Sequence, residues 1–188
     1  MSRRIVLPIL RAVLRELDAA AEKIAAGETD PAEGAPHNVD EAWAFFEAEG
    51  EGVGSTAKKR AADFKLADDE LSGAVLSALT RAQQAALAGD AKAFDTARDD
   101  VRGALNRIFA LATKKYAVEG AEDPVARQEG LAFSWGLSED LPADARKALA
   151  AAFAKAGSEG AAAAVNELLD EHAAALGYEA PLPEYEKG

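Results

Sequence analysis

The stretch that decides the fold is residues 94–117, FDTARDDVRGALNRIFALATKKYA. Its apolar residues recur at intervals of three and four, which places them on one side of an α-helix and most charged residues on the other. The residues of this inward side are Val101, Leu105, Ile108, Phe109 and Ala112. We therefore predict one long amphipathic helix from about Ala91 or Phe94 to Ala117.

Similar periodicity continues toward both ends of the chain and predicts further helices. Their approximate ranges are 4–26, 39–47, 55–64, 69–88, 124–135, 143–156 and 159–176. Asn38 stands three residues before Glu41, which is the spacing of a capping box. Asp123 followed by Pro124 is typical of an N-cap and a first helical position, and Gly89 is typical of a helix end. Because no alternating strand pattern occurs anywhere in the sequence, the predicted fold is an all-α helical bundle.

The segments between these helices contain most of the glycines and prolines. Residues 27–37 and 50–54 are therefore predicted to be loops, with Ser55 or Thr56 capping the helix that follows. Asp68 or Asp69 is expected to cap the next helix. The inward face of that helix should contain Leu71, Val75, Leu79 and Leu87. Gly157 should end the predicted helix 143–156. Residues 178–188 should form a loosely ordered tail.

The order of elements suggests an internal repeat within a single helical domain of residues 1–188. The segment 41–46, EAWAFF, lines up with residues 129–134, EGLAFS, and matches Glu, Ala and Phe in register. This predicts two pseudo-symmetric halves of about 4–90 and 91–177. Chance is the alternative, because alanine-rich helices resemble one another easily.

Charge and composition exclude several classes of function. The formal net charge of −12 repels nucleic acid and anionic membrane surfaces, while cations are plausible partners. The absence of cysteine excludes disulfides, thiolate metal sites and cysteine nucleophiles. No apolar run approaches the roughly 18 residues of a membrane span, and Arg11 and Arg15 make residues 1–17 an amphipathic helix rather than a secretory signal.

The repeat draws attention to Glu41 and Glu129, which would occupy equivalent places and could face one another. Two carboxylates brought together in a bundle must share a proton, pair with a cation such as Arg60, or bind a metal. Capping by Glu41 and solvation of Glu129 are the simpler alternatives. Glu16 flanks the apolar face of the first helix, and His172 lies beside Leu168 and Leu169, where a hydrogen-bonded core histidine is the alternative to a metal ligand.

Four segments resemble the Fe-assimilating protein family, low-iron-inducible secreted proteins of algae with bacterial and archaeal relatives. They are residues 39–46 (VDEAWAFF), 55–64 (STAKKRAADF), 114–116 (KKY) and 128–133 (QEGLAF). Lys58 departs from the family pattern, which usually has glutamate there. The resemblance implies an iron-linked binding function and an extracytoplasmic or periplasmic location, and it singles out Asp40, Glu41, Arg60 and Glu129.

Our first hypothesis is a non-enzymatic metal-binding bundle for iron or another transition metal. Its candidate ligands are Glu41, Glu129, Glu16 and His172, with Asp40, Arg60 and Tyr116 orienting them. The alternative is a structural or protein-interaction module without a metal. A metal-dependent oxidoreductase is disfavoured, because the sequence has no Glu-x-x-His motif of the di-iron type.

Overall fold

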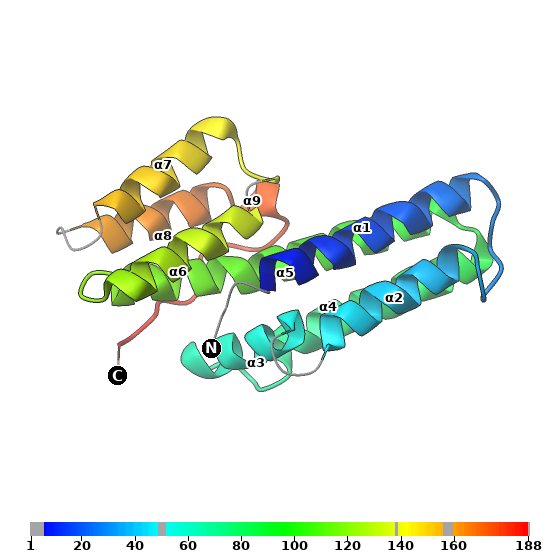
Figure 1. Ribbon diagram of the computed structural model, residues 1–188, viewed down its shortest axis with the longest axis horizontal. Coiled ribbons are helices and arrows are strands. Elements are labelled where there is room, and N and C mark those ends of the chain that lie inside the picture. Colours follow the sequence, from blue (N-terminus) through cyan, green and yellow to red (C-terminus); the bar gives the residue numbers. More distant parts are fainter. Residues whose placement is uncertain (1–5, 49–51, 138, 156–159, 188) are drawn as a thin grey trace. The chain divides into compact units, whose positions relative to one another are not determined.

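The computed structural model describes residues 6–48, 52–137, 139–155 and 160–187, and within these ranges it is helical with no strand (Figure 1). The helices are α1 (Val6–Ala25), α2 (Ala35–Glu47), α3 (Val53–Asp63), α4 (Glu70–Ala88), α5 (Ala91–Glu119), α6 (Pro124–Ser134), the 3-10 helix η2 (Trp135–Leu137), α7 (Ala143–Ala154), α8 (Ala161–Glu171) and α9 (Ala173–Leu176). The predicted all-α bundle is confirmed. None of the described helices has the length and apolar character needed to cross a membrane.

The chain forms two compact units. The first comprises residues 1–59 and 68–105, and the second comprises residues 60–67 and 106–188. The division therefore falls inside α3 and inside α5, whereas the predicted repeat would divide the chain between residues 90 and 91. The internal repeat stays a prediction.

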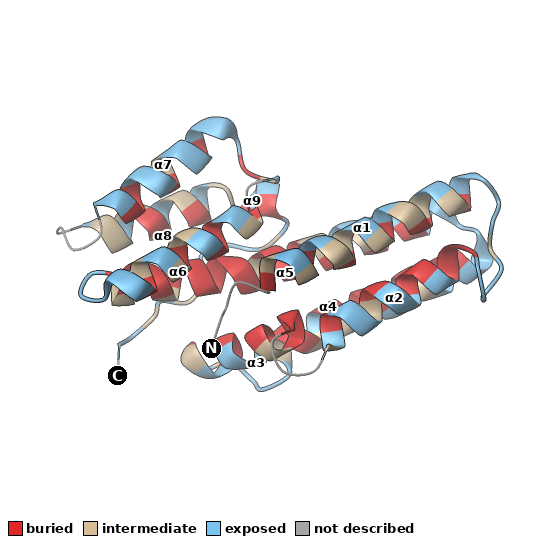
Figure 2. Cartoon of the chain, in the orientation of Figure 1, coloured by how far each residue is buried: buried red, intermediate tan, exposed pale blue. Residues whose placement is uncertain are grey.

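In the first unit, α1 packs on α2, and α2 packs on α4. Each of these helices is buried along one side and exposed along the other, as Figure 2 shows by colour. The buried side of α1 consists of Val6, Leu10, Val13, Leu17, Ala20 and Ile24. These residues recur at helical spacing, so burial of one apolar stripe explains why residues 6–25 form a helix.

Three details of the first unit differ from the sequence-based predictions. Helix α2 begins at Ala35, so Asn38 is a buried residue inside the helix and the capping box is wrong. Helix α3 begins at Val53, which places Gly54 inside it, and Thr56 bonds back to the carbonyl of Gly52 rather than capping. In α4, Leu87 is 51% exposed instead of facing inward. Gly89 ends that helix as predicted, and its backbone is left-handed.

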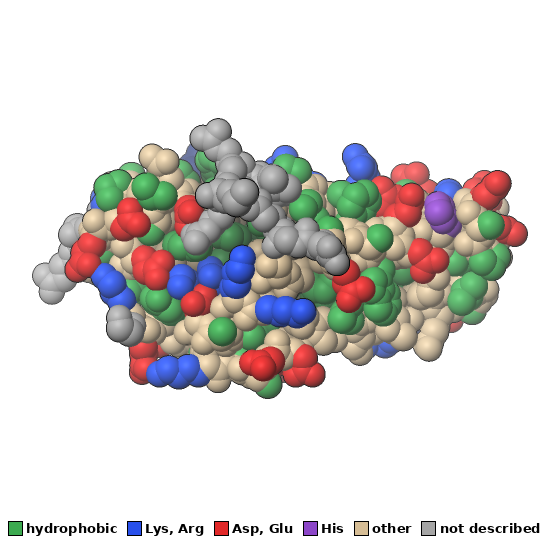
Figure 3. All heavy atoms as spheres, turned by 60° about the horizontal axis from the view of Figure 1, so that its bottom comes forward, with side chains coloured by type: hydrophobic (Ala, Val, Ile, Leu, Met, Phe, Trp, Pro, Cys, Tyr) green, Lys and Arg blue, Asp and Glu red, His purple; other side chains and the backbone are tan. Residues whose placement is uncertain are grey.

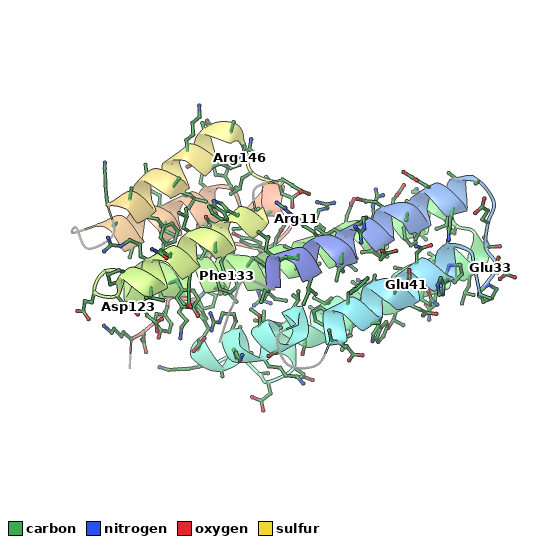
Figure 4. All side chains as sticks on the ribbon, in the orientation of Figure 1. Arg11, Glu33, Glu41, Asp123, Phe133 and Arg146 are labelled. Carbon is green, nitrogen blue, oxygen red and sulfur yellow. The ribbon has the colours of Figure 1, made fainter. Side chains whose placement is uncertain are left out.

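In the second unit, α7 packs against both α6 and α8. Asp123 caps α6 with its side chain, as predicted, by accepting a hydrogen bond from the backbone of Val125. Phe133 of α6, which is labelled in Figure 4, contacts two rings of α5. It stacks on Tyr116 with ring centroids 5.5 Å apart and meets Phe109 edge-on at 5.6 Å. These aromatic contacts join α6 to the second half of α5.

The C-terminal part of the second unit also departs from prediction. The predicted helix 159–176 is interrupted at His172, which ends α8 and precedes α9. The predicted stop at Gly157 lies outside the described residues. The tail after Gly177 docks more tightly than expected, because Tyr178 donates a hydrogen bond to Leu169 and the backbone of Leu182 donates one to Asp170.

Two glycine-to-alanine changes should have opposite effects on stability. A Cβ atom at Gly130 of α6 would lie 2.4 Å from the ring of buried Phe153 and 2.9 Å from Cβ of Tyr116, whereas one at Gly73 of α4 would meet nothing within 4 Å. We expect Gly130→Ala to lower the free energy of unfolding by about 1–3 kcal/mol through overpacking. Gly73→Ala should raise it by about 0.5–1 kcal/mol through helix propensity. Urea denaturation of both variants tests this, and a stable Gly130→Ala protein would contradict the close packing of α6.

Candidate functional site

A cluster of polar side chains surrounds the ammonium group of Lys115 in the second unit. Lys115 Nζ donates to Asp63 Oδ1 at 2.9 Å and lies 3.2 Å from Glu119 Oε1. It also lies 3.4 Å from the hydroxyl oxygen of Tyr185, which in turn donates to Glu119 at 2.8 Å. We call Asp63, Lys115, Glu119 and Tyr185 the Lys115 cluster. It brings two carboxylates and a phenol around one cation.

Three separate parts of the chain build this cluster. Asp63 is the last residue of α3, and the backbone then turns through Lys65, whose φ of 57° is left-handed. A hydrogen bond from the Leu66 amide to the Ala61 carbonyl closes this end of the helix. Lys115 and Glu119 lie one turn apart at the end of α5, and Tyr185 comes from the C-terminal tail. The cluster therefore depends on how α3 and the tail meet α5.

Arg60 is buried next to Asp63. Its side chain is only 5% exposed, and Nη2 lies 2.7 Å from Asp63 Oδ2 in an ion pair that lacks the alignment of a hydrogen bond. The guanidinium also lies over the Tyr116 ring, 5.3 Å from its centroid. Nε and Nη1 of Arg60 are buried and have no hydrogen-bond partner among the described residues. Buried guanidinium nitrogens are normally paired with an oxygen acceptor of the protein or of ordered water.

The charges of the Lys115 cluster shift the proton affinity of two of its members. Burial acts to lower the pKa of Lys115, but the hydrogen bonds and negative charges of Asp63 and Glu119 outweigh it, and the pKa is raised. Burial, together with the hydrogen bond to Glu119, raises the pKa of Tyr185 above its ordinary value. In the folded protein, lysine and tyrosine are therefore both held more firmly in their protonated forms.

The tail that carries Tyr185 is attached on both sides of it. Lys114, whose side chain is 1% exposed, donates to the Leu182 carbonyl at 3.0 Å and pairs with Glu184 at 3.2 Å. Lys65 pairs with Glu186 at 2.6 Å, and Lys187 pairs with Glu122. The Tyr185 ring packs on Phe64 with centroids 5.6 Å apart. These contacts hold the phenol at the cluster.

Three of the residues predicted from sequence lie in the first unit. Glu41 is exposed on α2, where Figure 4 labels it, and lies 3.6 Å from His37. Glu16 is 14% exposed and accepts a hydrogen bond from Asn38 at 2.8 Å, which joins α1 to α2. Asp40 is exposed and accepts a hydrogen bond from Gln83. Glu16 and Asp40 are therefore occupied by contacts within the bundle.

The other four lie in the second unit, where Arg60 and Tyr116 are close to each other as described above. Glu129 is half-buried on α6, and His172 is half-buried at the end of α8. Glu129 and Glu41 belong to different units, so their predicted pairing stays a prediction. Within the described ranges, no group of three His, Cys, Asp or Glu side chains is placed to hold a metal.

Sequence reasoning missed all four members of the Lys115 cluster. One of them, Lys115, had a local signal, because it and Lys114 interrupt an otherwise apolar stretch of α5 directly before Tyr116. A lysine at such a position needs oxygen partners, which the sequence does not name. Tyr185 had no such signal, because it is 66 residues from its partner Glu119.

Charged side chains of both signs lie on the side drawn in Figure 3. Basic side chains lie beside acidic ones there, so the two signs are mixed.

Stability should fall at alkaline pH because Lys115 and Tyr185 both have raised pKa values. A group whose pKa is higher in the folded state contributes its full stability below its unfolded pKa, about 10 for both residues. That contribution disappears as pH rises through the folded pKa. We expect the free energy of unfolding, measured by urea titration, to decrease above about pH 10.

Lys115→Met should make this alkaline decrease shallower, whereas Lys58→Met, at an exposed position of α3, should not change it. An identical pH profile in wild type and Lys115→Met would contradict the coupling between Lys115 and its carboxylates.

Comparison with known proteins places the chain in a family. The family model described as low iron-inducible periplasmic protein matches residues 5–119, which is more than half of the chain. This range includes Asp63, Lys115 and Glu119 but not Tyr185. No curated protein matches the chain, and neither does any solved structure. The chain belongs to the family of low iron-inducible periplasmic proteins, as its sequence motifs predicted.

Proposed function

We propose that this protein binds iron as its cargo in the periplasm and does not catalyse a reaction. Membership of a family described as low iron-inducible and periplasmic supports both the metal and the compartment. A protein made in response to low iron has a use for a site that captures the metal. The net charge of −12 favours the approach of cations.

The observation that carries the proposal is that Asp63 and Glu119 already hold a cation between them. Both contact the ammonium of Lys115, at 2.9 and 3.2 Å, and both are partly accessible, with side chains 22% and 26% exposed. Carboxylate oxygens are suitable ligands for iron, and partial exposure gives the metal a route to them. A metal at this position would take the place that the Lys115 ammonium now holds between the two carboxylates.

The carboxylate pair predicted from sequence, Glu41 and Glu129, is the alternative iron-binding site. Its support is the sequence match between the two segments and the family resemblance at both positions. The Lys115 cluster has the stronger support, because its oxygen atoms already surround one point. The rival pair is kept as a separate arm of the experiment.

A binding role fits this chain better than redox catalysis. The sequence contains two histidines, His37 and His172, and neither follows a glutamate by three residues as in di-iron carboxylate enzymes. Iron bound as cargo needs only ligands that can take it up and release it.

Elemental analysis and thermal unfolding with iron(II) and iron(III) test the proposal. Wild type is compared with two double variants, Asp63→Asn with Glu119→Gln and Glu41→Gln with Glu129→Gln, after circular dichroism has shown that each is folded. A ligand at a hundred times its dissociation constant adds about 2.7 kcal/mol to the free energy of unfolding. We expect that gain for wild type and for the Glu41 and Glu129 variant, and its loss in the Asp63 and Glu119 variant.

The reverse pattern would move the site to Glu41 and Glu129 and leave the function intact. Wild-type protein with neither bound iron nor a thermal shift would reject iron binding. In that case the chain would be the structural or protein-interaction module that its sequence also allows.

A further inference from the structure

We propose that the C-terminal tail, residues 178–187, occupies a surface that an acidic segment of a partner protein can bind in its place. The residues of this tail-binding surface contact the tail and are Phe64, Lys65, Lys114, Lys115, Asn166 and Asp170. The partner segment would be extended and would present a leucine, a tyrosine and carboxylates, as the tail does. The inference goes beyond iron binding and does not use the metal.

Charge complementarity identifies the ligand of this surface as acidic. Lys114, whose side chain is 1% exposed, donates to the Leu182 carbonyl at 3.0 Å and pairs with Glu184 at 3.2 Å. Lys65 pairs with Glu186 at 2.6 Å. A buried ammonium without oxygen partners is strongly destabilising, so the surface requires a ligand that supplies them.

Leu182 is the anchor of the tail. Its side chain is 2% exposed, its backbone N–H donates to Asp170 at 3.2 Å, and its carbonyl accepts from Lys114. Three residues later, the Tyr185 ring packs on Phe64 with centroids 5.6 Å apart. These contacts recognise a stretch of backbone, an aliphatic side chain and an aromatic one. A segment of another chain can supply all three.

The remaining contacts are weak enough for the tail to be displaced. Residues 182–187 form no helix. The side chains of the Lys65–Glu186 pair are 77% and 76% exposed, and those of the Lys187–Glu122 pair are 49% and 78% exposed. Exposed ion pairs contribute little to stability and are screened by salt. The tail can therefore detach while the helices stay folded.

Asn166 gives an independent sign that the tail fits the surface incompletely. Its Nδ2 donates to Glu184 Oε2 at 2.7 Å, but its Oδ1 is buried and has no hydrogen-bond partner among the described residues. Buried side-chain oxygens are normally paired. A segment with a hydrogen-bond donor beside the glutamate that replaces Glu184 would satisfy this oxygen. The surface therefore has capacity for a ligand that fits it better than the tail.

Peptide binding to the full-length protein tests the proposal. The probe is a fluorescein-labelled synthetic peptide of residues 178–187, YEAPLPEYEK, and its affinity is measured by fluorescence anisotropy. In wild type, the attached tail competes at a millimolar effective concentration. Leu182→Ala removes the anchor of the attached tail and leaves the tail-binding surface unchanged. We expect this variant to bind the peptide at least about tenfold more tightly than wild type does.

Two lysine variants, each made in the Leu182→Ala protein and checked for folding by circular dichroism, show where the peptide binds. Lys114→Met removes the ammonium that contacts the tail backbone and Glu184, so it should weaken binding by at least about tenfold. Lys58→Met, at an exposed position of α3, should leave the affinity unchanged.

Changes in the peptide test the chemistry of the partner segment. Glutamine at the positions of Glu184 and Glu186 should weaken binding by about tenfold, and added salt should weaken binding of the unchanged peptide. Alanine at the position of Leu182 or Tyr185 should weaken it by a similar factor. Equal affinity of all these peptides would overturn the stated chemistry of the partner.

Hydrogen exchange of the wild-type protein provides a test that needs no variant. Backbone amides of residues 182–187 should exchange much faster than those of residues 105–117 in α5, because the tail opens without unfolding of the helix. Equal protection of the two segments would make the tail a permanent part of the fold and overturn the proposal.

The binding experiments can also fail in ways that separate the occupants. No binding of the peptide to Leu182→Ala, or equal binding to this variant and wild type, overturns the proposal. A concentration-dependent wild-type dimer that Leu182→Ala abolishes, measured by light scattering, would assign the surface to the tail of a second copy and overturn the partner segment. Iron is absent from every arm, so these outcomes leave the proposed function untouched.

Discussion

Two consecutive lysines at the end of α5 impose the constraint on which the second unit depends. The side chains of Lys114 and Lys115 are only 1% and 13% exposed, and a buried ammonium without oxygen partners would cost several kcal/mol. Consecutive helical residues point in directions about 100° apart, so the two lysines need separate sets of partners. Lys114 takes the Leu182 carbonyl and Glu184 from the tail, and Lys115 takes Asp63, Glu119 and Tyr185. The tail and the end of α3 are held to α5 for this reason.

The same constraint connects stability to the proposed function. Partners that neutralise an ammonium are also partners that a metal cation can use, so one group of side chains can stabilise the empty protein and bind cargo. Because part of the attraction replaces lost hydration, the net stability of such a pair is modest. The description of the family as low iron-inducible is the link between the chain and iron.

Local sequence signals predicted the helices well where the decisive interactions are local. The apolar stripe of α1, the Asp123 cap of α6 and the left-handed Gly89 after α4 depend on residues within a turn of one another. Predictions failed where a distant partner competed with a local one. Asn38 has the spacing of a capping residue, but Pro36 and the preceding turn let the helix start at Ala35. The side-chain amide of Asn38 donates a hydrogen bond to Glu16 of α1 instead. The periodicity of residues 159–176 also gave no sign that the helix breaks at His172.

By itself, the sequence determined the all-α class, most helix boundaries, the family and two residues of the site region, Arg60 and Tyr116. These follow from periodicity, capping and motifs, all of which are properties of neighbouring residues. Lys115 and Glu119 are one helical turn apart, but only the tertiary structure decided that Asp63 and Tyr185 join them. Lys115 is 52 residues from Asp63 and 70 from Tyr185, so no local pattern records the contact. The physical reason is that burial of the α5 lysines selects partners by their oxygen atoms and their reach, wherever those partners lie in the chain.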